Sequence, residues 1–174
     1  MIHYQFAAIS PFTEGNGRTG RILNELYLVQ QELLPMPVLC MSGQMAKNKV
    51  LYQHLLAGVA EHNNWQEWIK YNLTIIAESA QRTTDKIKKL VSLKKQVDSE
   101  LKKVLGSSYT PMLLHLMFES PYLKIELLEK RGLAHRQTAS TWLKKLVSAG
   151  ILSEQKKGKT LYFTDKRLMA ILAS

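Results

Sequence analysis

Residues 10–21 read Ser-Pro-Phe-Thr-Glu-Gly-Asn-Gly-Arg-Thr-Gly-Arg, and this stretch decides the fold. Its three glycines permit backbone angles that other residues resist, so successive N–H groups can point into one concavity. Apolar residues at helical spacing begin directly afterwards, at Ile22, Leu23 and Leu26. The turn is therefore expected at a helix N-terminus, where the helix dipole favours an anion. The pattern predicts a phosphate site.

Charged side chains in the same stretch support this prediction. Arg18 and Arg21 are three residues apart, so they share one side of the first helical turns and can grip a polyphosphate. Glu14 stands just before the turn, where a carboxylate can hold a hard cation such as Mg²⁺ beside the phosphates. The expected ligand is a polyphosphate with its metal.

The stretch resembles the signature of the Fic (filamentation induced by cAMP) family, His-Pro-Phe-x-Asp/Glu-Gly-Asn-Gly-Arg-x-x-Arg. The family's usual activity is the transfer of AMP from ATP to a hydroxyl side chain of a target protein. The resemblance implies ATP and Mg²⁺ as cofactors, with the metal at Glu14. It assigns the phosphates to five residues: Gly15, Asn16 and Gly17 for the α- and β-phosphates, and Arg18 and Arg21 for the β- and γ-phosphates.

One position departs from the signature. Ser10 stands where the family has the histidine that takes the proton from the attacking hydroxyl, and a serine hydroxyl cannot act as an imidazole does near neutral pH. His3 precedes Ser10 by seven residues, about 10 Å along a helix, so we expect it to pack or to lie at the surface. The sequence predicts a Fic-type protein that binds nucleotide or phosphate and lacks useful AMP-transferase activity.

The rest of residues 1–81 is expected to be helical. Residues 1–9 predict the last turns of a helix, Ser42 is expected to cap a second helix that runs to His62, and a third begins at Trp65. Lys49-x-x-Tyr52 resembles the family's adenosine-pocket segment, which implies that Tyr52 contacts nucleotide; a half-buried helix residue is an equally favoured interpretation.

The family has helices and a β-hairpin flap before its motif, and this sequence lacks them. We therefore expect residues 1–81 to form the C-terminal portion of a Fic domain, in a piece of a longer protein or in the product of a gene that begins late. A core cut in this way exposes apolar surface, which favours a homodimer.

Composition and charge set further limits. The 174 residues are 45% hydrophobic, as in a globular protein, and no apolar run is long enough to span a membrane. The sequence shows no signal peptide and has Cys40 as its single cysteine. We therefore expect a cytoplasmic protein without an internal disulfide or a membrane partner.

The charged residues are distributed unevenly between the two halves. Residues 1–81 carry five Lys and Arg against six Asp and Glu, whereas residues 82–174 carry nineteen Lys and Arg against eight Asp and Glu. The basic half suggests a polyanion partner; a solvated surface is the alternative.

The second half predicts a connecting helix and a small domain. Residues 82–106 form a lysine-rich amphipathic helix, and residues 107–174 predict three helices, at 110–119, 123–130 and 135–147, then strands at 151–155 and 160–163. This order resembles the winged helix-turn-helix modules often found after a Fic domain. The predicted fold class is mainly α: part of a helical Fic domain followed by three helices and a small β-hairpin.

A DNA-binding regulator, with the Fic part as sensor or scaffold, is the alternative function. Arg136 and Gln137 are of the types that read base edges, and lysines suit phosphate contacts. The candidate DNA-binding residues are Arg136, Gln137, Ser140, Thr141 and Lys144 on the third helix and Lys156, Lys157 and Lys159 at the hairpin tip. Modules of this kind also serve as protein-interaction domains.

Overall fold

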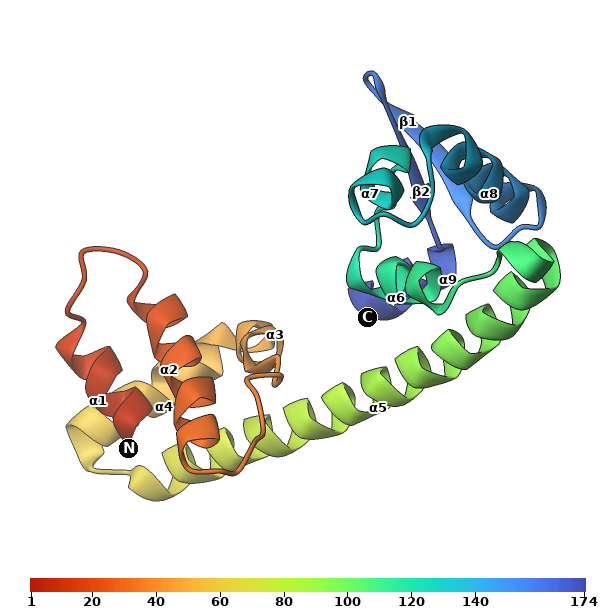
Figure 1. Cartoon of the computed structure of the whole chain (residues 1–174). Helices are drawn as coiled ribbons and strands as arrows, with labels where there is room; N and C mark the ends of the chain where they lie inside the picture. Colours follow the sequence, from red (N-terminus) through yellow and green to blue (C-terminus); the bar gives the residue numbers. More distant parts are fainter. The chain divides into compact units, whose positions relative to one another are not determined.

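The computed structural model describes residues 1–174 and divides them into two compact units, 1–85 and 86–174. The chain is mainly helical, with one two-stranded antiparallel sheet, which confirms the predicted fold class (Figure 1). The elements are α1 (Ile2–Ile9), α2 (Asn16–Gln30), α3 (Met41–Lys47), α4 (Lys49–His62), α5 (Trp65–Leu105), α6 (Pro111–Glu119), α7 (Ile125–Lys130), α8 (Arg136–Ser148), β1 (Ser153–Lys157), β2 (Thr160–Thr164) and α9 (Lys166–Ala173). None of these helices combines the length and the apolar character needed to cross a membrane.

The helix expected from Ser42 to His62 is two helices, and the prediction of one was wrong. Asn48 separates α3 from α4 with an extended φ of −135°, and its side chain accepts a hydrogen bond from the Leu51 N–H at 3.1 Å. Asparagine favours such an N-cap because its side chain replaces a helical partner for an N–H group. Ser42 does not cap a helix, and its hydroxyl accepts a hydrogen bond from Arg21 instead.

The helices expected from Trp65 and from Arg82 are one continuous helix, α5, of 41 residues. No glycine or proline interrupts the sequence between Trp65 and Leu105, so nothing ends the helix. The predicted connecting segment, 82–106, contributes four residues to the core of the second unit: Leu93, Val97, Leu101 and Leu105. Their spacing of four places them along one face of α5.

The second unit surrounds one core of seventeen buried residues, drawn from α5 to α9 and from the hairpin. In the hairpin, Lys157 pairs with Thr160 across the two-residue loop of Gly158 and Lys159, and Gly158 has a φ of +62°. Leu123 adds an isolated antiparallel bridge to Phe163. The expected strands are confirmed with a shift at β1, which begins at Ser153, whereas α9 was not predicted.

The first unit has a smaller hydrophobic cluster, formed by Leu39, Met41, Met45 and Ile75. A second group of contacts is aromatic and joins α1, α4 and α5 through His3, Tyr4, Tyr52, Trp65, Trp68 and Tyr71. α1 and α2 lie side by side as neighbours in this unit (Figure 1). The loop between them carries the predicted phosphate turn.

Candidate functional site

Ser10 ends α1 in a left-handed conformation, with a φ of 44°. Its N–H donates to the carbonyl of Phe6 at 3.0 Å, and its hydroxyl donates to the carbonyl of Ala7 at 2.7 Å. Both groups therefore satisfy carbonyls at the end of the helix. The residue at the position of the family's base closes a helix terminus.

Asn16 holds the loop that leads into α2. Its side-chain oxygen accepts from the Phe12 N–H at 3.0 Å, and its amide nitrogen donates to the Phe12 carbonyl at 2.6 Å. Gly15, the N-cap of α2, has a φ of +84°, a conformation that favours glycine. The first helical bond of α2 runs from the Thr19 N–H to the Gly15 carbonyl, so the preceding N–H groups of the helix have no helical partner. These N–H groups can receive an anion.

The guanidinium groups of Arg18 and Arg21 lie close to the backbone of the glycine turn. A side-chain carbon added to Gly17 would lie 3.4 Å from the Nη1 atom of Arg21, and one added to Gly15 would lie 3.8 Å from the Nη2 atom of Arg18. Arg21 also donates from Nε to the Ser42 hydroxyl at 3.1 Å, a contact that sequence reasoning missed. Two guanidinium groups and free helix N–H groups therefore converge on one turn.

A cavity of about 140 Å³ lies beside this turn. Its walls come from α1, the loop, α2 and α4: His3, Phe6, Ala7, Ser10, Asn16, Gly17, Gly20 and Tyr52. The fold thus brings together four predicted site residues, Ser10, Asn16, Gly17 and Tyr52. Gly15, Arg18 and Arg21 belong to the adjoining turn, although they do not line the cavity.

His3 is buried in this wall, only 7% exposed, and makes polar contacts that sequence reasoning missed. Its Nε2 lies 2.9 Å from the Tyr52 hydroxyl, and its Nδ1 lies 3.2 Å from the Gly20 carbonyl and 3.0 Å from the Asn24 amide nitrogen. Burial lowers the pKa of the imidazole, so its neutral form is favoured. No local sequence signal indicated these contacts, because the partners of His3 lie 17 to 49 residues further along the chain.

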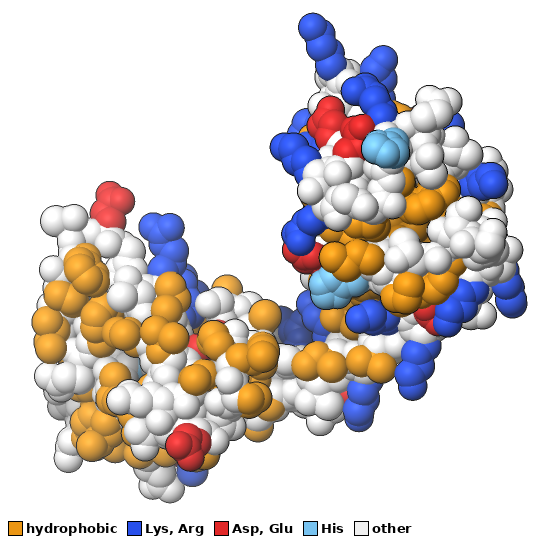
Figure 2. Space-filling view, in the orientation of Figure 1, with side chains coloured by type: hydrophobic (Ala, Val, Ile, Leu, Met, Phe, Trp, Pro, Cys, Tyr) orange, Lys and Arg blue, Asp and Glu red, His pale blue; other side chains and the backbone are white.

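The second unit presents its candidate residues at the surface. Seven of the eight are exposed, Ser140 is half-buried, and none forms an ion pair. The three hairpin lysines, Lys156, Lys157 and Lys159, lie at the projecting tip, where Figure 2 shows basic side chains. Elsewhere in the unit, Arg131 and Arg167 pair with carboxylates.

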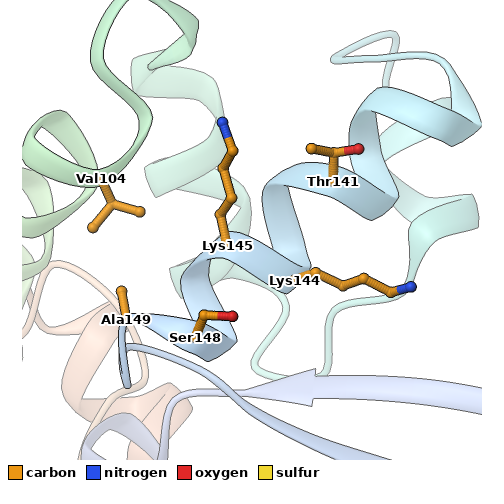
Figure 3. A pocket seen from close by; sticks show the side chains of 6 residues that line it. All are labelled: Val104, Thr141, Lys144, Lys145, Ser148 and Ala149. Carbon is orange, nitrogen blue, oxygen red and sulfur yellow. The ribbon is translucent and has the colours of Figure 1, made fainter.

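A shallow groove of about 550 Å³ runs beside α8 in this unit. It is lined by Val104 of α5 and by Thr141, Lys144, Lys145, Ser148 and Ala149 from α8 and the residue after it (Figure 3). Lys144 and Lys145 point in different directions from the helix in this view. The groove therefore includes two of the candidate nucleic-acid contacts, Thr141 and Lys144.

Comparison with known families accounts for parts of both units. Residues 1–28 match the model of the Fic/DOC family, and residues 93–168 match the C-terminal domain described as protein adenylyltransferase SoFic-like. The chain is a Fic/Fido domain protein. The first match contains the whole phosphate turn, and the second runs from the last part of α5 into α9.

The Fic signature residue Glu14 lies apart from other candidate metal ligands. Its side chain is exposed and forms no ion pair, and no group of three His, Cys, Asp or Glu side chains in the chain could hold a metal ion. The Fic turn therefore offers a metal one carboxylate. A metal bound there needs ligand oxygens from elsewhere, which the phosphates of a nucleotide can provide.

Proposed function

We propose that this Fic protein binds a nucleoside triphosphate at the turn between α1 and α2. The nucleotide that we expect is ATP. The observation that carries the proposal is the convergence of Arg18 and Arg21 on the N-terminus of α2. Guanidinium groups form strong charge-assisted hydrogen bonds with phosphate, and a helix N-terminus adds N–H donors and a favourable dipole. The matched families, which include an adenylyltransferase, support ATP as the nucleotide.

Mg²⁺ fits this site when phosphates are bound. It usually keeps several waters and takes one or two carboxylates together with substrate phosphates, and Glu14 supplies one carboxylate next to the turn. The metal would offset negative charge on the phosphates. Arg18 and Arg21 hold the remaining charge from the side of α2.

AMP transfer to a hydroxyl of a target protein requires a group that removes the hydroxyl proton while pyrophosphate leaves. Ser10 occupies the position of the family's histidine, and its hydroxyl donates to Ala7. A positioned base contributes about 10²–10⁴-fold to such a reaction. We therefore propose that the Ser10 form binds nucleotide and transfers AMP slowly.

Calorimetry of Mg·ATP binding tests the first part. Arg21→Ala should weaken binding at least tenfold, because it removes a charge-assisted contact, whereas Arg136→Ala in the second unit should leave the affinity unchanged. Equal affinity of the wild-type chain and Arg21→Ala would count against a phosphate site at this turn.

A transfer assay with labelled ATP tests the role of Ser10. Ser10→His should raise label incorporation by about 10²–10⁴-fold over the serine form. A matched Ser10→Ala variant should behave as the serine form does. Efficient transfer by the serine form itself would overturn this part of the proposal.

DNA binding by the second unit is a second candidate function. The order α6, α7, α8, β1 and β2, with Leu123 bridged to Phe163, supports a winged helix-turn-helix module. The unit carries eighteen Lys and Arg against seven Asp and Glu, and its candidate contacts on α8 and the hairpin tip are free of ion pairs. Such cations supply the electrostatic part of nucleic-acid affinity.

The salt dependence of binding to a labelled duplex tests this candidate. Replacing Lys156, Lys157 and Lys159 with glutamine should reduce the slope of log K against log salt concentration by about 2–3, since each phosphate contact contributes about 0.9. The matched control replaces Lys88, Lys89 and Lys95 of α5, which changes the net charge equally and should leave the slope nearly unchanged. Equal effects of the two triple variants would indicate attraction by net charge alone.

A further inference from the structure

His3 is held from several sides within the wall of the cavity. Its ring stacks on Trp68 with 6.0 Å between centroids and an interplanar angle of 18°. It meets the ring of Tyr52 nearly edge-on, at 5.9 Å and 71°. Tyr52 in turn packs against Trp68 at 5.7 Å. The three rings form one aromatic unit that joins α1, α4 and α5.

Hydrogen bonds fix the orientation of the imidazole within this unit. One ring nitrogen faces the carbonyl of Gly20 and the amide of Asn24 on α2, while the other faces the Tyr52 hydroxyl on α4. Gly20 leaves no spare room, because a side-chain carbon there would lie 3.3 Å from the His3 ring and 3.2 Å from Phe6. The position of the Tyr52 hydroxyl therefore depends on His3.

We propose that His3 is a positioning residue that holds Tyr52 against the nucleoside part of the ligand. This inference rests on the proposed nucleotide binding and extends it to a residue outside the phosphate turn. A neutral imidazole suits the task, because it can donate from one nitrogen and accept at the other while its faces pack against rings. Substituting Phe for His3 retains an aromatic ring and removes the polar contacts of both ring nitrogens.

One part of the cavity wall suits the nucleoside of the ligand. Its volume of about 140 Å³ is several times the roughly 30 Å³ that one water occupies in the liquid, so it can accept part of a nucleotide and not the whole. Phe6, Ala7 and Tyr52 give it an apolar and aromatic surface. The phosphate turn also lines it, through Ser10, Asn16 and Gly17, and both arginines lie at that turn. A ligand that lacks the nucleoside should therefore be insensitive to His3.

The test compares Mg·ATP with Mg·tripolyphosphate, which carries the phosphates without a nucleoside. His3→Phe and Tyr52→Phe should each weaken ATP binding about threefold to tenfold, the effect of one lost hydrogen bond, and should leave tripolyphosphate binding unchanged. The double variant should bind ATP no more weakly than either single variant, because both remove the same contact. Arg21→Ala is the control that weakens both ligands.

Loss of affinity for both ligands in His3→Phe, or unchanged ATP affinity, overturns the positioning role while nucleotide binding stands. Absence of ATP binding by the wild-type chain overturns the proposed function and this inference with it. The thermal midpoint of each variant shows whether it folds. Should His3→Phe fail to fold, Tyr52→Phe decides the question, because it removes only one hydroxyl.

Discussion

The two units differ in how much hydrophobic surface they bury. The second unit surrounds a cluster of seventeen buried residues, whereas the main cluster of the first has four. The first unit also exposes large apolar side chains, among them Ile22, Leu26, Leu33 and Leu73, and Figure 2 shows hydrophobic side chains over this unit. Burial of apolar surface is the main favourable contribution to folding. The second unit is thus built for independent stability, whereas the first holds its site with a smaller apolar core and with polar and aromatic contacts.

The two units also differ in whether their polar side chains are already paired within the protein. In the first unit, the polar side chains at the turn form hydrogen bonds with neighbouring backbone and side-chain groups, as Ser10, Asn16 and His3 do. In the second, the cations of α8 and of the hairpin tip are exposed and unpaired. Preorganised groups suit a small ligand of defined shape, and exposed surface cations suit a polyanion.

Truncating one leucine in each unit gives the largest contrast. Leu143 is fully buried in the second core, so Leu143→Ala should cost about 2–5 kcal/mol of unfolding free energy. Leu73 is 60% exposed, and Leu73→Ala should stay within about 0.5 kcal/mol. Denaturant titration followed by circular dichroism measures both. A large cost at Leu73 would mean that this face is covered in solution.

Two helical glycines of the first unit give the next contrast. Gly20→Ala should destabilise by about 1–3 kcal/mol, because the added carbon crowds Phe6 and His3 at the contact of α1 with α2. Gly58 lies in α4 with no atom near the position of an added carbon, so Gly58→Ala should stabilise by up to about 1 kcal/mol. Thermal unfolding of both variants measures the difference. A neutral Gly20→Ala would show that α1 and α2 are not tightly packed.

Sequence patterns predicted the elements whose signals are local. The glycines and arginines of residues 15–21 indicated the turn at the start of α2, and alternation in residues 160–163 indicated a strand that became β2. The length of α5 was missed because the largely polar stretch 78–86 separates two amphipathic patterns, which were read as two helices. The break at Asn48 was missed because a single side-chain cap leaves little trace in the hydrophobic pattern.

The candidate site was predicted in its residue types and not in its hydrogen bonds. Spacing identified Arg18 and Arg21, but their common turn depends on backbone angles at Gly15. The contacts of His3 with Tyr52 and of Arg21 with Ser42 join residues 49 and 21 positions apart, and no local pattern encodes such pairs. Long-range polar contacts follow from the packing of helices, which periodicity alone does not define.

The pH dependence of stability should separate the units. Burial lowers the pKa of His3 below 6.5, so the stability it contributes is complete above pH 6.5 and is lost as the pH falls below that value. The Arg21 guanidinium and the N-terminal amine act in the same direction. In the second unit, hydrogen bonds from Arg167 lower the pKa of Glu100 below 4.5, so its contribution is lost only below that pH.

As the pH falls from 6.5 toward 4.5, the first unit should therefore weaken while the second does not. The indole NMR signals of Trp65 and Trp68 report on the first unit, and that of Trp142 reports on the second. In His3→Phe the early change should disappear. Simultaneous change of all three indoles in the wild-type chain would contradict a separate titration at His3.

The smallest expected effect concerns Ser42, which holds Arg21 at the turn. Ser42→Ala removes the acceptor 3.1 Å from Arg21 Nε and leaves the guanidinium charge in place. Because one exposed hydrogen bond contributes about 0.5–1 kcal/mol, Mg·ATP affinity should fall about twofold to fivefold, far less than in Arg21→Ala. Thr74→Ala, an exposed substitution on α5, is the control and should have no effect. If Ser42→Ala matched Arg21→Ala, the arginine would act through its contact with α3, and direct phosphate binding by its guanidinium would be ruled out as the main source of affinity.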